Sequence, residues 1–154
     1  RDPAVAWSGA VSQFLVVWWD GRGPDESSDE VFGRMLQGDG ARVGAEKRIA
    51  RAAEGKTPLP GVAWSGEAAR FLVVWQDWRN ADDPPNRGAD LYGRLIGADW
   101  APFGTAFRVS GANALGSECG PAVAWSPGAT RFQVAWEDWR EAAHPAVFGR
   151  RVAG

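Results

Sequence analysis

The chain has 154 residues and a formal charge of −2 at pH 7, with 45% hydrophobic and 23% charged residues. This composition is typical of one globular domain that is large enough to bury a core. The mild acidity gives no basic surface for nucleic acid, and no stretch reaches the roughly 18 apolar residues that span a membrane, so neither partner is predicted. A single cysteine, Cys119, excludes an intrachain disulfide framework.

The first fifty residues predict a small antiparallel sheet. Residues 3–8 and 13–20 are rich in Val, Phe and Trp and are joined by a short link that contains glycine, which predicts a β-hairpin. Residues 30–37 predict a third strand, and residues 42–50 predict a weaker fourth one. Both faces of the second strand are apolar, so we expect other sheets to cover this sheet on both sides.

The same succession of strands returns twice along the chain. Its copies are separated by 56 to 61 residues, and the spacing changes only where loops change length. The recurring motifs are Pro-x-Val-Ala-Trp-Ser at 3–8, 60–65 and 121–126, Phe-x-Val-x-Trp-x-Asp-x-Arg at 14–22, 71–79 and 132–140, and Phe/Tyr-Gly-Arg at 32–34, 92–94 and 148–150.

Repeats of this length with periodic glycine and aromatic residues predict the blades of a β-propeller. We predict an all-β fold in a single domain (1–154) made of three four-stranded blades at 3–50, 60–110 and 121–153, the last of which lacks its outer strand. Closed propellers need about four to eight blades. The chain is therefore predicted to form half of a six-bladed ring or a fragment of a larger propeller, completed by a second copy or by another chain.

The third copy differs from the others on one face. Polar side chains replace large apolar residues of the first copy at three positions, namely Gln133 for Leu15, Glu137 for Trp19 and Arg151 for Met35. Terminal repeats of an array commonly carry such a polar face. This face is predicted to be exposed to solvent or to lie at a polar subunit contact.

Nearly the whole chain resembles bacterial β-propeller repeat proteins whose blades carry the pattern Pro-x-Val-Ala-Trp … Val-Val-Trp-x-Asp-x-Arg … Phe/Tyr-Gly-Arg. The resemblance implies the propeller fold and an extracellular or cell-surface location in a bacterium, but it implies no activity. The chain opens at Arg1 without methionine or a signal-like segment, which favours a piece of a longer protein.

The loops that follow the second strand of each copy vary, while the strands that flank them are constant. Variable loops on a constant scaffold are typical of binding faces. Aromatic residues beside polar groups suit stacking on sugar rings or on apolar peptide groups. The predicted lectin-like rim consists of Trp78, Arg79, Trp139, Arg140 and Arg22. In the alternative, the two tryptophans close the core or stack under the neighbouring arginines as cation–π pairs.

Other polar residues recur in every copy and are predicted to be structural, because an active site is needed only once. The aspartates of this set are expected to accept hydrogen bonds from loop N–H groups or from arginines. The set consists of Asp20, Asp77, Asp138, Arg34, Arg94 and Arg150.

Oxygen ligands gather in the loop of the second copy, where Asp82, Asp83 and Asp90 are weak candidates for binding calcium. They do not match EF-hand spacing, so a solvated acidic loop is the preferred interpretation and no other cofactor is predicted. The only histidine, His144, has no nucleophile that the sequence would place beside it.

The sequence therefore predicts a non-enzymatic binding or assembly module with a glycan or a protein as its ligand on the loop rim. Two alternatives remain open: a part of a secreted hydrolase whose catalytic residues lie partly in another chain, and a structural spacer of a surface protein.

Overall fold

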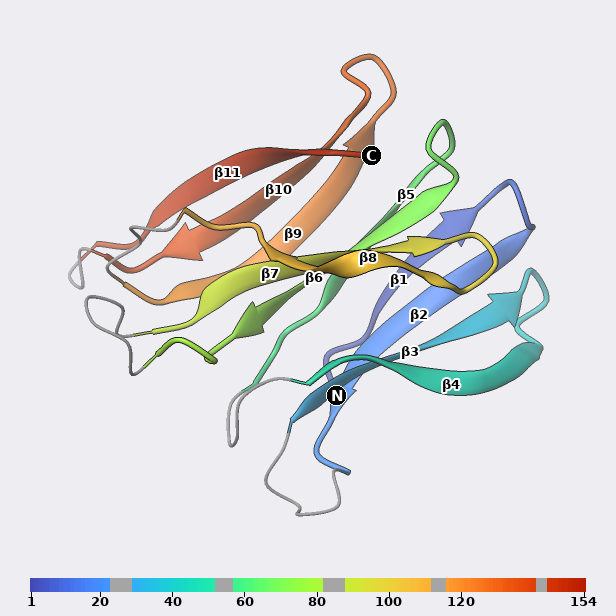
Figure 1. The fold of residues 1–154 in the computed structure, drawn as a ribbon, viewed down its shortest axis with the longest axis horizontal. Helices are drawn as coiled ribbons and strands as arrows, with labels where there is room; N and C mark the ends of the chain where they lie inside the picture. Colours follow the sequence, from blue (N-terminus) through green and yellow to red (C-terminus); the bar gives the residue numbers. More distant parts are fainter. Residues whose placement is uncertain (23–28, 52–56, 82–87, 112–115, 141–143) are drawn as a thin grey trace.

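The computed structural model describes residues 1–22, 29–51, 57–81, 88–111, 116–140 and 144–154. These residues form three antiparallel sheets of four, four and three strands, and no helix occurs among them (Figure 1). The predictions of an all-β fold and of a third sheet without a fourth strand are confirmed. No described segment is a helix that could cross a membrane.

The strands follow each other in chain order across each sheet. Sheet 1 contains β1 (Ala4–Ser8), β2 (Gln13–Asp20), β3 (Glu30–Gln37) and β4 (Arg42–Arg51). Sheet 2 contains β5 (Gly61–Ser65), β6 (Arg70–Asp77), β7 (Asp90–Gly97) and β8 (Pro102–Arg108). Sheet 3 contains β9 (Glu118–Ser126), β10 (Arg131–Asp138) and β11 (Ala146–Ala153).

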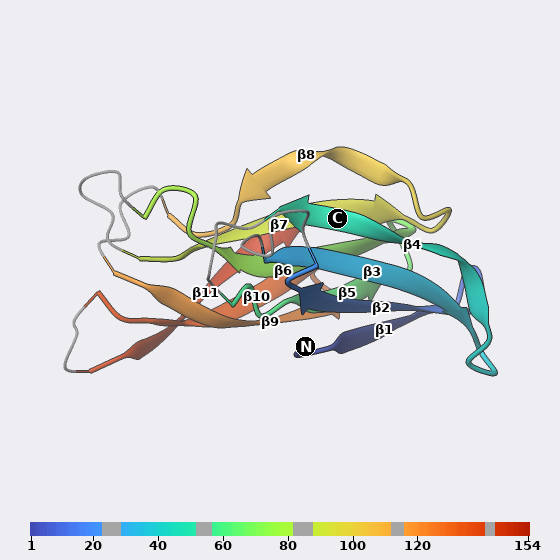
Figure 2. The ribbon, with the colours of Figure 1, turned by 90° about the horizontal axis from the view of Figure 1, so that it is seen from below.

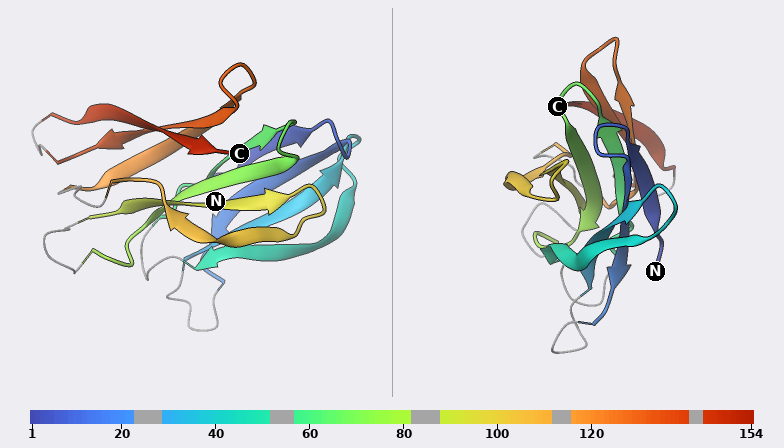
Figure 3. Two further views of the ribbon diagram at one scale, coloured as in Figure 1. Left: turned by 45° about the horizontal axis from the view of Figure 1, so that its top comes forward. Right: turned by 90° about the vertical axis from the view of Figure 1, so that its right-hand side faces the viewer.

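The three sheets stack face to face, with sheet 2 in the middle (Figures 1 and 3). Their first strands β1, β5 and β9 contact one another in that order, and β8 lies on the opposite side of the molecule (Figure 2). Successive sheets are therefore joined along their first strands.

The core lies in two layers, one on each face of sheet 2. Phe71, Val73 and Trp75 are fully buried in the layer against sheet 1, and Leu72 and Val74 are fully buried in the layer against sheet 3. Neighbouring residues of one strand point to opposite faces, so a strand that is apolar at every position requires cover on both sides. Sheet 2 meets this expectation.

Sheets 1 and 2 approach closely at Gly33, in the middle of β3. A Cβ atom at this position would lie 2.7 Å from Cη2 of Trp100 and 2.9 Å from Cδ1 of Ile49. Trp100 belongs to the turn between β7 and β8, and Lys47 of β4 donates a hydrogen bond to its carbonyl oxygen at 3.2 Å. The glycine of the Phe/Tyr-Gly-Arg motif thus has a packing reason in sheet 1, because only glycine leaves room for the indole ring.

The two outer faces of the stack differ in character. On sheet 3, Gln133, Glu137 and Arg151 are exposed, as predicted for the polar face of the third copy. On sheet 1, the apolar residues Val5 and Trp7 are 58% and 43% exposed. One end of the stack is therefore polar, while the other presents an uncovered apolar surface.

Candidate functional site

The second and third strands of each sheet meet at one end, which we call the rim. Register pairs place Asp20 opposite Glu30, Asp77 opposite Asp90, and Asp138 opposite Ala146. Figure 1 shows the strand ends of sheets 2 and 3 on the left and those of sheet 1 below them. The residues of the predicted lectin-like set all lie at or just beyond these strand ends.

The Asp-x-Arg motif of sheet 2 forms a cluster of hydrogen bonds around one carboxylate at the rim. The fully buried carboxylate of Asp77 accepts hydrogen bonds from the backbone N–H of Arg79 at 3.0 Å and from Nε1 of Trp75 at 3.0 Å. The Arg79 guanidinium lies 2.5 Å from the same carboxylate. This hydrogen bond raises the pKa of Arg79 above its ordinary value, so the guanidinium is charged at every physiological pH.

The motif repeats in the other two sheets with different burial. In sheet 3, Asp138 is buried and accepts hydrogen bonds from the backbone N–H of Arg140 at 3.0 Å and from its Nε at 2.9 Å. These contacts with Arg140 lower the pKa of Asp138. In sheet 1, Asp20 and Arg22 form a more exposed pair at 2.6 Å, and Arg22 also contacts Glu46 at 3.0 Å.

Each of the three arginines stacks on an aromatic ring of the third strand rather than on a neighbouring tryptophan. The guanidinium carbon of Arg79 lies 4.1 Å from the ring centroid of Tyr92, and that of Arg140 lies 4.3 Å from the ring of Phe148. The alternative in which Trp78 and Trp139 stack under Arg79 and Arg140 therefore does not describe these arginines. Arg22 follows the same pattern over Phe32, at 5.3 Å.

The tryptophans beside these arginines differ in exposure. Trp139 is 40% exposed, and Trp78 is half-buried. With Arg79 and Arg140 each held between a carboxylate and a ring, the rim combines fixed cations with accessible indole surface. That combination can stack on a flat apolar face and donate hydrogen bonds at its edge.

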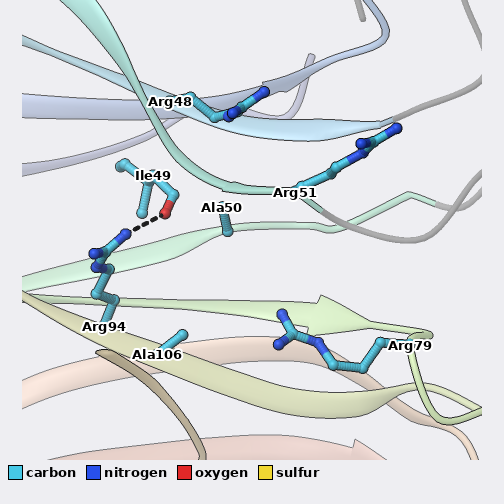
Figure 4. A pocket seen from close by; sticks show the side chains of 7 residues that line it. All are labelled: Arg48, Ile49, Ala50, Arg51, Arg79, Arg94 and Ala106. Atoms are coloured by element: carbon cyan, nitrogen blue, oxygen red, sulfur yellow. Dashed lines mark hydrogen bonds between the residues drawn. The ribbon is translucent and has the colours of Figure 1, made fainter. Parts of the chain in front are cut away.

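Each predicted rim arginine also lines a cleft. Arg22 lines one of about 500 Å³ together with Trp19 and Thr57, and Arg140 lines a small one of about 80 Å³ that includes His144. The cleft at Arg79 measures about 650 Å³ and lies between sheets 1 and 2 (Figure 4). We call it the arginine cleft, and its walls are Arg48, Ile49, Ala50, Arg51, Arg79, Arg94 and Ala106.

The arginines of the Phe/Tyr-Gly-Arg motif connect neighbouring sheets. Arg94 of sheet 2 donates through Nη1 to the carbonyl oxygen of Ile49 in sheet 1, at 3.0 Å. Arg150 of sheet 3 donates in the same way to Val109, which follows β8, at 2.9 Å. Arg34 of sheet 1 donates to Gly44 of its own sheet at 2.6 Å.

Of the calcium candidates, Asp82 and Asp83 lie outside the described residues. The buried carboxylate of Asp90 is paired with Arg108 and accepts a hydrogen bond from Nδ2 of Asn80 at 3.1 Å. Among the residues that the structure describes, no group of three or more His, Cys, Asp or Glu side chains could hold a metal ion. Asp90 thus serves as the acceptor of an ion pair at the start of β7.

One titratable group near the rim is not indicated by the sequence. Glu118, the first residue of β9, is fully buried, and its Oε2 atom accepts a hydrogen bond from the backbone N–H of Leu91 at 3.2 Å. Burial raises the pKa of Glu118 to about 7. The repeat gave no signal for it, because the equivalent residue of the second copy is Thr57. Its side chain has no contact with solvent.

No protein-family model and no curated protein matches the chain. Solved structures do resemble it in fold. An N-acetylgalactosamine deacetylase from F. plautii, solved with blood group B trisaccharide, aligns with 98% of this chain at a TM-score of 0.61 and 11% identity. A thermostable family-43 glycoside hydrolase aligns with 99% of the chain at a TM-score of 0.57 and 11% identity.

An exo-1,5-alpha-L-arabinanase from a bovine ruminal metagenomic library is similar over 97% of the chain, at a TM-score of 0.52 and 13% identity. At such identities the likeness shows the fold alone, which is all-β and propeller-like. The chain spans about half the length of these structures, which it covers to 49%, 54% and 52%.

Proposed function

We propose that the chain is a three-blade segment of a β-propeller that binds a glycan on its rim without catalysing a reaction. One observation carries the proposal: the exposed residue Trp139 directly precedes Arg140, whose guanidinium is held in place by Asp138 and Phe148. Ordered donors next to an aromatic surface lose little conformational entropy when a ligand binds. The F. plautii structure holds a trisaccharide, which favours a sugar over a peptide as the ligand.

Replacing both rim tryptophans, Trp78→Ala with Trp139→Ala, is expected to weaken glycan binding by about tenfold or more, as for tryptophans that dominate other binding sites. A glycan array followed by titration calorimetry with the best ligand measures the effect. Trp7→Ala is the matched control, because Trp7 is also 43% exposed but lies near the β1–β2 turn, at the other end of the strands. Equal binding by all three proteins would contradict a site on the rim.

A second candidate function is a part of a glycoside hydrolase. It is favoured by the similar family-43 structure, of which this chain covers 54%. Cleavage of an arabinan or another polysaccharide that appears only when a second polypeptide is added would support it. If neither binding nor cleavage is found, the chain is a structural spacer of a surface protein.

We further propose that another blade covers the open face of sheet 1. Val5 is 58% exposed, whereas Val62, at the same position of sheet 2, is 8% exposed because it packs on sheet 1. Arg94 and Arg150 each donate to a carbonyl oxygen of the preceding sheet or its continuation, and a preceding blade would give Arg34 the same partner. A blade placed on sheet 1 would therefore extend the pattern of the existing interfaces.

The chemistry of the two end faces favours another chain over a second copy as this blade. The face that sheet 1 offers to sheet 2 is apolar, with Leu15 and Val17 fully buried. In a head-to-tail ring of two copies, the open face of sheet 1 in one copy would pack against the outer face of sheet 3 in the other. That outer face exposes Gln133 and Glu137. Burying an unpaired carboxylate against an apolar face is unfavourable.

This choice of partner can be tested by converting one face into the other. The protein is expected to remain a monomer of 16.6 kDa, and the variant with Gln133→Leu, Glu137→Trp and Arg151→Met is expected to form dimers. Sedimentation velocity measures both masses, and adding Val5→Lys to the triple variant should abolish the dimer. A dimer of the unmodified chain would point to a second copy, and a monomeric triple variant would contradict an interface at sheet 1.

A further inference from the structure

The arginine cleft concentrates positive charge in a chain whose net charge is −2. Arg48 and Arg51 come from β4 on one side, and Arg79 and Arg94 come from sheet 2 on the other (Figure 4). The seven wall residues, all of them in the described part of the chain, include four arginines and no acidic residue. The volume of about 650 Å³ lies within the range of small-molecule sites, which is about 300 to 1,000 Å³.

Arg48 and Arg79 each have a carboxylate partner, which fixes the position of the guanidinium. Arg48 contacts Glu30 at 2.7 Å and Arg79 contacts Asp77 at 2.5 Å. Arg94 is held by the backbone carbonyls of Ile49 and Gly104, at 3.0 and 3.4 Å, and these neutral groups do not cancel its charge. Its Nε atom is buried and has no hydrogen-bond partner. The cleft therefore keeps positive charge on side chains that are already ordered.

The equivalent groove between sheets 2 and 3 differs from the cleft at one arginine position. Arg108, Arg140 and Arg150 occupy the positions of Arg48, Arg79 and Arg94, with the same types of partner. At the position of Arg51, however, this groove has Gly111. Three arginines of the cleft thus follow from the way the sheets are joined, whereas the exposed Arg51 is an addition specific to the cleft.

We infer that the arginine cleft binds the acidic groups of a glycan that carries carboxylates or sulfates. Planar guanidinium groups bind both kinds of oxyanion through paired, charge-assisted hydrogen bonds. The cleft opens beside the rim, since Arg79 lines it and directly follows Trp78. The inference rests on the proposed glycan-binding function and adds the charge class of the ligand.

The experiment compares four probes on the same protein by titration calorimetry: trigalacturonate for carboxylates, a heparin-derived hexasaccharide for sulfates, a neutral galactose trisaccharide, and hexaglutamate for an acidic peptide. At least one acidic glycan is expected to bind about tenfold or more tightly than the neutral one, the effect of one strong ionic contact, and its affinity is expected to fall as salt is raised. The acidic glycan that binds more tightly shows whether the cleft prefers carboxylates or sulfates.

Arg51→Ala is expected to weaken binding of the acidic glycan by about tenfold and to leave the neutral one unchanged. Arg42→Ala is the control, because Arg42 is an exposed arginine at the opposite end of β4 and does not line the cleft. Equal binding of acidic and neutral glycans, an unaltered Arg51→Ala variant, or tighter binding of hexaglutamate would overturn the inference. If the neutral trisaccharide binds and loses affinity only when Trp78 and Trp139 are replaced, the proposed function stands while this inference fails.

Discussion

Glu118→Gln is expected to make the protein more stable at pH 8 and to flatten the pH dependence of its stability. Glu118 is fully buried, and while Oε2 has the N–H of Leu91 as a donor, Oε1 is buried without a partner. Burial is the main reason that its pKa rises to about 7, and the nearby negative charges of Asp90 and Asp138 add to the effect. At pH 8 the folded protein therefore holds an ionised carboxylate in an unfavourable place.

The sign of the effect follows from proton binding. The pKa of Glu118 is about 7 in the folded chain, against an ordinary value of 4.5, so between these values the folded state holds a proton that the unfolded state has released. The contribution to stability is fully present below about pH 4.5 and is lost as the pH rises through about 7. A shift of this size corresponds to a free energy on the order of 3 kcal/mol.

Urea unfolding at pH 5, 6, 7 and 8 measures this contribution. The free energy of unfolding of the unmodified chain should fall over this range by more than that of Glu118→Gln, because glutamine has the same shape and does not titrate. Glu137→Gln is the control, since Glu137 lies on the same sheet and is exposed. Parallel curves for the unmodified chain and Glu118→Gln would show that Glu118 does not titrate in this window.

The strands of this fold were predictable because hydrophobic alternation and turn residues mark them. Residues 13–20 and 70–77 were predicted as strands, and β2 and β6 have the same bounds. The start of β9 was predicted at residue 121, but the strand begins at Glu118. Its pairing with β10 shifts register between Ala135 and Glu137 and then continues, so Cys119 also lies in this strand. Where a strand contains a register shift beside glycine and proline, its residues do not alternate between apolar and polar. The sequence pattern therefore does not reveal the start of such a strand.

The site was predictable only where its parts are close in sequence. The two-residue spacing within Asp77-x-Arg79 was enough to predict a carboxylate that accepts from the loop and its arginine. Trp78 was one candidate for the ring under that arginine, but the ring is that of Tyr92, which β6 and β7 place opposite Trp75 near the end of the strand. The arginine cleft was not predicted, because its walls come from two different sheets and their distance depends on how the sheets pack.

Asp77→Ala is expected to lower the free energy of unfolding by about 3 kcal/mol, whereas Asp20→Ala, the same motif position in sheet 1, is expected to lower it by less than about 1 kcal/mol. The Asp77 carboxylate is fully buried, and its loss leaves Nε1 of the fully buried Trp75 without its acceptor and frees the loop N–H of Arg79. Asp20 is half-buried and pairs with an exposed arginine at the surface, where an ion pair contributes little.

Urea unfolding of the two variants under one condition measures this difference, and circular dichroism at low urea confirms that each still folds. The two aspartates share their strand position and their arginine two residues later, so the comparison separates the effect of burial from that of the motif.

Sheet 2 is covered on both faces, while the outer face of sheet 1 is open. If a partner blade covers sheet 1 in the assembled protein, the cost of Asp20→Ala should rise toward that of Asp77→Ala in the assembly. Equal losses in the isolated chain would instead show that the motif, and not its cover, sets the contribution.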